Sequence, residues 1–162
     1  MASDLSNIIK EELANTLEQL LSKKTSVQSV SKANVSEYEN TQSIEVGVKF
    51  EFKNLTSNWK FFVPTVTASK FEYLMLGGMG DLKEHIDDEI TDAVNEIISN
   101  ICGSFCTSTN AQGLSDVGSV KSEIKSASIV EGSILAKKTN IYEFNLSLES
   151  EKLPVIVYFD EI

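Results

Sequence analysis

The sequence predicts an α/β domain of the α+β kind, in which a central sheet carries two long helices on one face. Two segments repeat apolar residues at spacings of three and four, which is the pattern of an amphipathic helix that buries one side. Several other segments alternate apolar and polar residues or run apolar over a short stretch, which is typical of strands. No linker divides the 162 residues, so we expect a single domain over residues 1–162.

The first half of the chain should contain one long helix and three strands. The helix is expected from Ser3 to Ser22. Alternation predicts one strand from Ser26 to about Glu37 and another from Ile44 to Phe52, joined by a turn at residues 39–42. A short apolar strand follows at Trp59–Val63. The apolar stripe of the long helix consists of Leu5, Ile9, Leu13, Thr16, Leu17 and Leu20.

The second half should begin with a shorter helix and then repeat the order of the first. Pro64 suits the start of a helix at Thr65–Leu76, and Gly77-Gly78 should end it. The second long helix is expected from Asp88 to about Thr107, and a loop rich in Ser, Thr, Asn and Gly from Thr107 to Gly118. Three further strands are expected near Val120–Val130, Lys138–Leu148 and Leu153–Phe159.

The two halves share a weak internal repeat. Residues 12–15, Glu-Leu-Ala-Asn, take the place in the first long helix that residues 96–99, Glu-Ile-Ile-Ser, take in the second. The match is short, so an internal duplication and a chance likeness are both open.

The charge of the chain limits its partners and its location. Asp and Glu number 24 against 14 Lys and Arg, which gives a formal net charge of −10 at pH 7. An acidic surface repels nucleic acid and anionic membranes; it would suit a basic partner, or simply keep the protein soluble. No apolar run reaches the length of a membrane span, and residues 1–4 are acidic where a signal peptide would be basic. We therefore expect a cytoplasmic protein with neither nucleic acid nor membrane as partner.

The sequence predicts no metal or cofactor of the chain's own. Cys102 and Cys106 lie one turn apart in the second long helix, where a disulfide fits poorly, so both should be reduced and buried. The single histidine, His85, has no adjacent nucleophile, and residues 77–80 lack the Lys-Ser/Thr of a phosphate-binding loop.

What remains is a set of carboxylates and amides on the long helices. Glu12 and Asn15 are one turn apart on the first helix. On the second, Asp92, Glu96 and Ser99 follow one another at i, i+4 and i+7, opposite the apolar stripe. Such a row is also what any solvated helix face carries, so the residue types alone do not define a site.

The second long helix resembles the signature helix of the CheC, CheX and FliY proteins of bacterial chemotaxis and flagellar switching. Residues 92–103, Asp-Ala-Val-Asn-Glu-Ile-Ile-Ser-Asn-Ile-Cys-Gly, are similar to the family motif of an acidic or Ser residue, three residues, Glu, two residues and Asn, with an apolar residue and Gly shortly after. Residues 74–78, Leu-Met-Leu-Gly-Gly, resemble the segment that precedes this motif in CheX. The resemblance extends to the order of elements along nearly the whole chain, and implies two long helices related by a pseudo-twofold.

In the first helix, the resemblance implies that Glu12 and Asn15 are the catalytic Glu and Asn. Ile8 stands where the family has its acidic or Ser residue, which is a departure from the motif. This helix nevertheless keeps the two residues that matter most for the chemistry.

In the second helix, the resemblance implies a weakened or silent site. Asp92 and Glu96 match the motif, and Asp92 would help to bind the partner. The Asn position holds Ser99, however, and Asn100 faces about 100° away unless a local helix bulge turns it back. Glu96, Ser99 and Asn100 are therefore candidate catalytic residues of a second, incomplete motif.

The activity that the resemblance implies is hydrolysis of the aspartyl phosphate on a CheY-type response regulator. The Asn amide would orient the attacking water without titrating, and the Glu would pair with a Lys of the partner to fix docking. The divalent cation would belong to the regulator. One alternative is a non-catalytic module that binds phosphorylated CheY in a flagellar switch. Another is a structural homodimer without a regulator partner.

Overall fold

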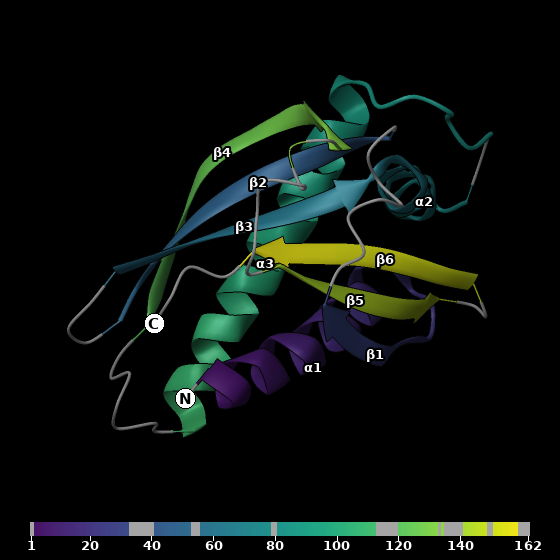
Figure 1. The fold of residues 1–162 in the computed structure, drawn as a ribbon. Helices are drawn as coiled ribbons and strands as arrows, with labels where there is room; N and C mark the ends of the chain where they lie inside the picture. The colour runs from purple at the N-terminus through teal and green to yellow at the C-terminus, as the bar shows by residue number, and fades with distance from the viewer. Residues whose placement is uncertain are drawn as a thin grey trace.

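The computed structural model describes residues 2–32, 41–52, 56–78, 81–112, 120–132, 134, 141–148 and 151–158. Within these residues, three helices cover one face of a six-stranded antiparallel sheet (Figure 1). This arrangement confirms the predicted α+β class. The elements are α1 (Ala2–Leu21), β1 (Thr25–Lys32), β2 (Gln42–Glu51), β3 (Thr56–Pro64), α2 (Thr65–Met75), α3 (Asp88–Gln112), β4 (Lys121–Glu131), β5 (Ile141–Leu148) and β6 (Glu151–Tyr158).

The sheet has a pseudo-twofold axis between β3 and β6. Its strand order is β1-β5-β6-β3-β2-β4. If β1, β2 and β3 are exchanged with β4, β5 and β6, respectively, the same order is obtained in reverse. The two outer pairs also match, since the register of β1 on β5 shifts between Val27 and Ser29, and that of β4 on β2 shifts beside Gly47 and Val48. The helices that precede the two sets of strands, α1 and α3, pack against each other (Figure 1). The predicted pseudo-twofold is confirmed.

The core lies between the helices and one face of the sheet. Alternate residues of β2, namely Ile44, Val46 and Val48, are almost fully buried there, as the alternation predicted. Strand β3 places Phe61 opposite Val46 and Trp59 opposite Val48, so the same face continues across the neighbouring strand. Buried residues from all three helices belong to the same cluster. The apolar stripes of both long helices therefore face the same side of the sheet.

An aromatic cluster holds α3 over β2 and β3. The ring centroids of Phe50 and Trp59 are 4.5 Å apart, those of Phe50 and Phe105 are 5.3 Å apart, and those of Trp59 and Phe105 are 5.4 Å apart. Such pairs add about 0.5–1.5 kcal/mol each beyond the burial of their area. The middle of α3 is thereby fixed relative to the sheet.

Both ends of α2 follow the sequence prediction closely. Pro64 precedes the helix with an extended backbone, φ −61° and ψ 157°. At the other end, the amide of Gly77 donates to the carbonyl of Leu74 at 3.0 Å, and that of Gly78 donates to Tyr73 at 2.9 Å. The two glycines have φ values of 82° and 75°, a region that glycine occupies without steric penalty.

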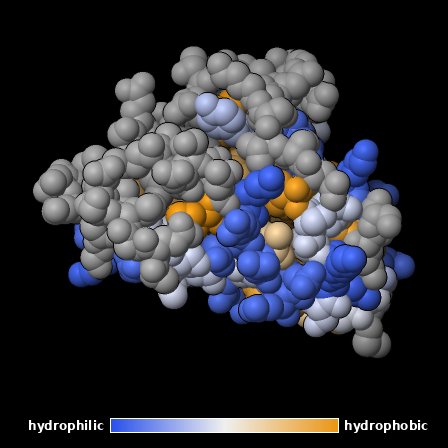
Figure 2. Space-filling model, turned by 90° about the horizontal axis from the view of Figure 1, so that it is seen from below, coloured by the Kyte–Doolittle hydropathy of each residue, from blue (hydrophilic) through white to orange (hydrophobic). Residues whose placement is uncertain are grey.

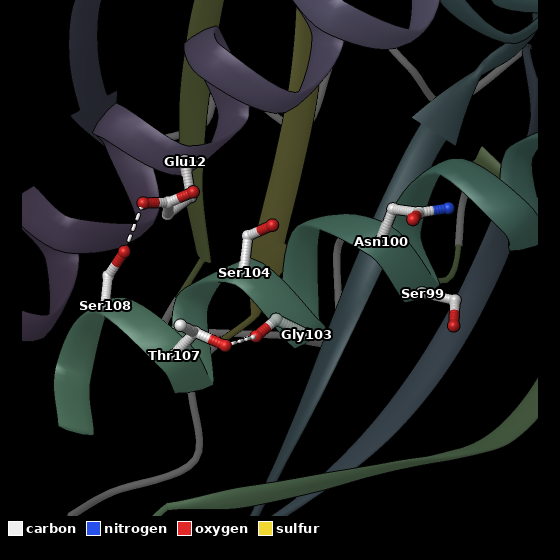
Figure 3. Close-up of a pocket in the computed structure, with 7 residues that line it drawn as sticks. All are labelled: Glu12, Ser99, Asn100, Gly103, Ser104, Thr107 and Ser108. Atoms are coloured by element: carbon white, nitrogen blue, oxygen red, sulfur yellow. Dashed lines mark hydrogen bonds between the residues drawn. The ribbon is translucent and has the colours of Figure 1, made fainter. Parts of the chain in front are cut away.

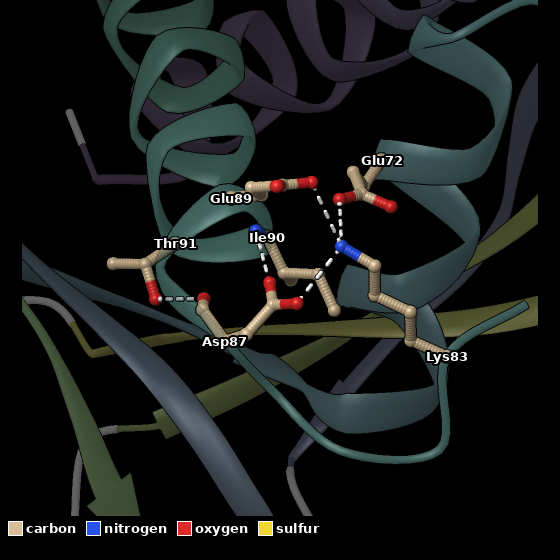
Figure 4. A network of polar contacts seen from close by, with 6 residues as sticks. All are labelled: Glu72, Lys83, Asp87, Glu89, Ile90 and Thr91. Carbon is tan, nitrogen blue, oxygen red and sulfur yellow. Dashed lines mark hydrogen bonds and ion pairs between the residues drawn. The ribbon is translucent and has the colours of Figure 1, made fainter.

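A network around Lys83 ties α2 to the start of α3 (Figure 4). The Lys83 Nζ lies 2.7 Å from Glu72 Oε2, 2.8 Å from Asp87 Oδ2 and 3.0 Å from Glu89 Oε2. The other carboxylate oxygen of Asp87 accepts the amide of Ile90 at 2.9 Å and so caps the first turn of α3. Hydrogen bonds to Asp87 and Glu72 raise the pKa of Lys83, and the bond from Lys83 lowers the pKa of Asp87.

The predicted loop at Thr107–Gly118 is wrong over its first part, because α3 continues to Gln112. Thr109 is fully buried, and its hydroxyl donates to the carbonyl of Phe105 at 2.8 Å, one turn earlier. The side chain of Asn110 accepts the amide of Val120 at 2.8 Å and donates to its carbonyl at 3.4 Å. Burial and these bonds to the start of β4 stabilise a helical turn that composition alone does not favour. Residues 113–118 lie outside the described residues.

Other boundaries differ by a few residues. Strand β3 begins at Thr56 and β6 at Glu151, both earlier than predicted. The predicted end of β1 near Glu37, the start of β5 at residues 138–140 and the last residue of β6 lie outside the described residues. No helix in the described part of the chain is long and apolar enough to span a membrane.

Candidate functional site

A shallow, open hollow of about 440 Å³ lies on the surface where the two long helices meet. Six of the residues that line it belong to α3, and α1 contributes a carboxylate (Figure 3). They are Glu12, Ser99, Asn100, Gly103, Ser104, Thr107 and Ser108. The sequence prediction named three of these: Glu12, Ser99 and Asn100.

The hollow follows one face of α3. Its α3 residues are the adjacent pairs 99–100, 103–104 and 107–108, which recur every four positions and therefore lie in rows along one side of the helix. All six have small polar side chains or none. A Cβ added to Gly103 would meet nothing within 4 Å, so the floor of the hollow is open there. The opposite side of the helix carries the buried isoleucines of the core.

Glu12 and Ser108 join the two helices at one end of the hollow. The hydroxyl of Ser108 donates a hydrogen bond to Oε1 of Glu12 (Figure 3). The second carboxylate oxygen of Glu12 points away from Ser108 in this view. Both side chains are half-buried. A charge-assisted bond of this kind is stronger than one between neutral groups, so it restrains the carboxylate.

Asn100 lies about two turns before Ser108 in α3, near the other end of the hollow (Figure 3). Its Nδ2 donates to the carbonyl of Glu96 at 2.8 Å, so part of the amide is engaged by its own helix. Ser99 points in a different direction from Asn100. The helix is regular from Asp88 to Gln112, so no bulge brings Asn100 into the position of Ser99.

The remaining predicted residues do not line the hollow. Asn15 is exposed on α1, one turn after Glu12. Glu96 and Asp92 are exposed on α3 before the hollow begins. The structure therefore brings Glu12 together with the second motif, whereas Asn15 stands on the outer side of α1. On the side of the molecule where α1 lies, hydrophilic side chains predominate among the described residues (Figure 2).

The sequence analysis missed Gly103, Ser104, Thr107 and Ser108. Gly103 closes the resemblance motif but was not predicted as a site residue, Ser104 directly follows the motif, and the last two fall where a loop was expected. Their signal is a four-residue repeat along residues 99–108, in which two small residues, polar or glycine, alternate with two apolar residues. That repeat is a helix pattern, and the abundance of Ser and Thr concealed it.

Both cysteines lie on the buried side of α3, as predicted. Cys102 and Cys106 are free thiols, and burial raises the pKa of each. A thiol that resists ionisation is a poor nucleophile and a poor metal ligand. Among the described residues there is no group of three or more His, Cys, Asp or Glu side chains placed to hold a metal ion.

A twofold-related antiparallel sheet with two long helices packed on one face is the fold of the CheC, CheX and FliY proteins. The structure of FliY from Thermotoga maritima is similar with a TM-score of 0.72 and 19% identity, covering 95% of this chain and 85% of that one. A CheC-like superfamily protein from Shewanella sp. PV-4 has a TM-score of 0.68 and 15% identity, covering 99% and 100%.

The third similar structure contains a partner. It is the complex of CheX with CheY, BeF3 and magnesium from Borrelia burgdorferi, with a TM-score of 0.63, 14% identity, and coverage of 96% of this chain and 97% of that one. No protein-family model matches the sequence, and no curated protein matches it. The likeness is therefore one of fold.

Proposed function

We propose that this chain binds a phosphorylated response regulator of the CheY type and hydrolyses its aspartyl phosphate. The fold supports this, since a CheX protein of the same fold is solved in complex with CheY, BeF3 and magnesium. The formal net charge of −10 also favours a partner with a basic surface.

The observation that carries the catalytic part is the exposed amide of Asn15 on α1. The side-chain amide of Asn15 is exposed and makes no hydrogen bond with the described residues, so its donor and its acceptor face solvent. It lies one turn from Glu12, so a partner that approaches α1 can meet both side chains. Asn100, by contrast, donates to the carbonyl of Glu96.

The proposed reaction is attack of a water oxygen on the phosphorus of the phosphoaspartate. The bond from the aspartyl oxygen to phosphorus breaks, and inorganic phosphate and the free aspartate are the products. Asn15 accepts a hydrogen bond from the water and holds it in line with the breaking bond, as the Gln of small GTPases does. Glu12 pairs with a Lys of the regulator and fixes its angle of approach. The regulator supplies the divalent cation.

The second candidate is binding without hydrolysis, as in a flagellar switch. It is favoured by the engagement of Glu12 with Ser108 and by the Ser at position 99 in place of an amide. On this reading both motifs would serve docking alone.

One pair of measurements separates the two candidates. Phosphate release is followed from a phosphorylated CheY-type regulator of the same source, with and without the chain. Binding is measured with the regulator activated by beryllofluoride, which replaces the phosphoryl group and does not hydrolyse. Binding with accelerated release supports the phosphatase, and binding alone supports the switch module. Absence of binding would contradict both.

A further inference from the structure

We propose that Ser108 is a positioning residue that holds the Glu12 carboxylate in the orientation that docks the regulator. This inference rests on the proposed function, and it assigns α3 a role at the site on α1. The two residues are 96 positions apart in the sequence, and the hydrogen bond from Ser108 to Glu12 Oε1 is the direct polar link that joins α1 to α3 among the described residues (Figure 3).

The Ser108 hydroxyl comes from a fixed part of the fold. The neighbouring residue Thr109 is fully buried and bonds to Phe105, and Asn110 bonds through both ends of its amide to Val120, the residue directly before β4. The last turns of α3 are thus tied to the sheet. A hydroxyl on such a turn can orient a more mobile group with little loss of its own freedom.

Glu12, in contrast, has a long side chain on the edge of α1. The adjacent residue Leu13 is fully buried, which fixes the backbone, but a glutamate has several rotatable bonds beyond it. The bond to Ser108 removes part of that freedom before any partner arrives. An ionised carboxylate accepts hydrogen bonds on both oxygens. One oxygen can therefore stay on Ser108 while the other, which points away from it, receives a Lys of the regulator.

Removing the hydroxyl should therefore weaken docking and spare the chemical step. Ser108→Ala leaves Glu12 free to rotate, so the Kd for the beryllofluoride-activated regulator should rise about tenfold, as for the loss of one charge-assisted hydrogen bond. The kcat at saturating phosphorylated regulator should stay unchanged, because Asn15 rather than Glu12 places the water. Ser108→Thr keeps a hydroxyl at the same position and should restore binding.

The matched control is Thr91→Ala, which removes from α3, outside the hollow, a hydroxyl that donates to the carbonyl of Asp87 and does not bond to Glu12. It should bind like the natural chain. In the Glu12→Ala background, Ser108→Ala should cause no further loss, since the group it positions is gone. Far-ultraviolet circular dichroism of each variant excludes a loss of the fold as the cause.

Three results would overturn the inference in different ways. If the natural chain binds the regulator and Ser108→Ala binds equally well, the positioning role is wrong and the proposed function stands. If the natural chain does not bind the regulator at all, the proposed function fails, and the role of Ser108 fails with it. If Ser108→Ala weakens binding of the regulator equally in the natural chain and in the Glu12→Ala background, the inference is also wrong. Ser108 would then affect binding by a route that does not involve Glu12.

Discussion

Helices α1 and α3 each precede three strands of the sheet and bury one apolar stripe in the same core, yet their outward faces differ. On α1, Asn15 is exposed one turn after Glu12. On α3, the equivalent Asn position is Ser99, and the neighbouring Asn100 donates to a carbonyl of its own helix. The two helices thus follow the pseudo-twofold in their buried residues. They differ in the residues that face the hollow and solvent.

The reason for this difference is that packing constrains the two faces unequally. A buried stripe must match the volume of the sheet beneath it, and changes there destabilise the fold. An exposed polar residue can change with little effect on stability, so the second motif could lose its amide while the helix stayed in place. In the proposed function, α1 therefore carries the chemistry and α3 supports it.

The largest expected effect concerns the two asparagines. Asn15→Ala should lower phosphate release at saturating regulator about a hundredfold, because one group that organises the transition state is removed. Binding of the beryllofluoride-activated regulator should be almost unchanged. Gln19→Ala, which removes an exposed amide one turn farther along α1, is the matched control.

Asn100→Ala is the corresponding change on α3 and should leave turnover intact. If it abolishes phosphate release while Asn15→Ala does not, α3 is the working helix and the assignment of the two sites must be exchanged.

The next effect concerns the two glutamates. Glu12→Ala should weaken binding of the activated regulator about thirtyfold, since removing one partner of an interfacial charge pair costs about 2 kcal/mol. Glu96→Ala, an exposed residue on α3, should change the Kd by less than about twofold, because exposed polar groups contribute little. Titration calorimetry with the same regulator gives both values. Equal losses would mean that the two helices dock alike.

A smaller effect should come from completing the second motif. Ser99→Asn, made in the Asn15→Ala background, places an amide at the motif position on a regular helix. It should raise phosphate release about tenfold above that background, because an amide there can orient water. Ser99→Leu, in which the side chain has similar size and no amide, is the control. No gain would show that α3 lacks more than the amide.

The smallest effect should be on stability. Gly103→Ala replaces the glycine in the middle of α3, where a Cβ has open space, and should raise the free energy of unfolding by about 1 kcal/mol. The reverse change on the other helix, Ala14→Gly, should lower it by at least about the same amount. Urea denaturation measures both through the transition midpoint. A loss of stability in Gly103→Ala would mean that the floor of the hollow is less open than the structure shows.

The sequence by itself determined the elements whose side chains repeat with a clear period. The stripe that includes Leu13 and Leu17 predicted α1, and the alternation from Ile44 to Phe52 predicted β2, because in both cases the pattern reflects which side faces the core. Gly77-Gly78 predicted the end of α2, since the required backbone angles favour glycine. The motif at residues 92–103 led to the fold that the solved structures share.

Only the tertiary structure decided how α3 ends and which side chains meet. The segment after Thr107 has a loop-like composition, yet burial of Thr109 keeps it helical. The same extension carries Ser108 to Glu12, a contact across 96 positions that no local period encodes. Contacts between distant segments depend on how the elements pack, and that packing decided which predicted residues share the hollow.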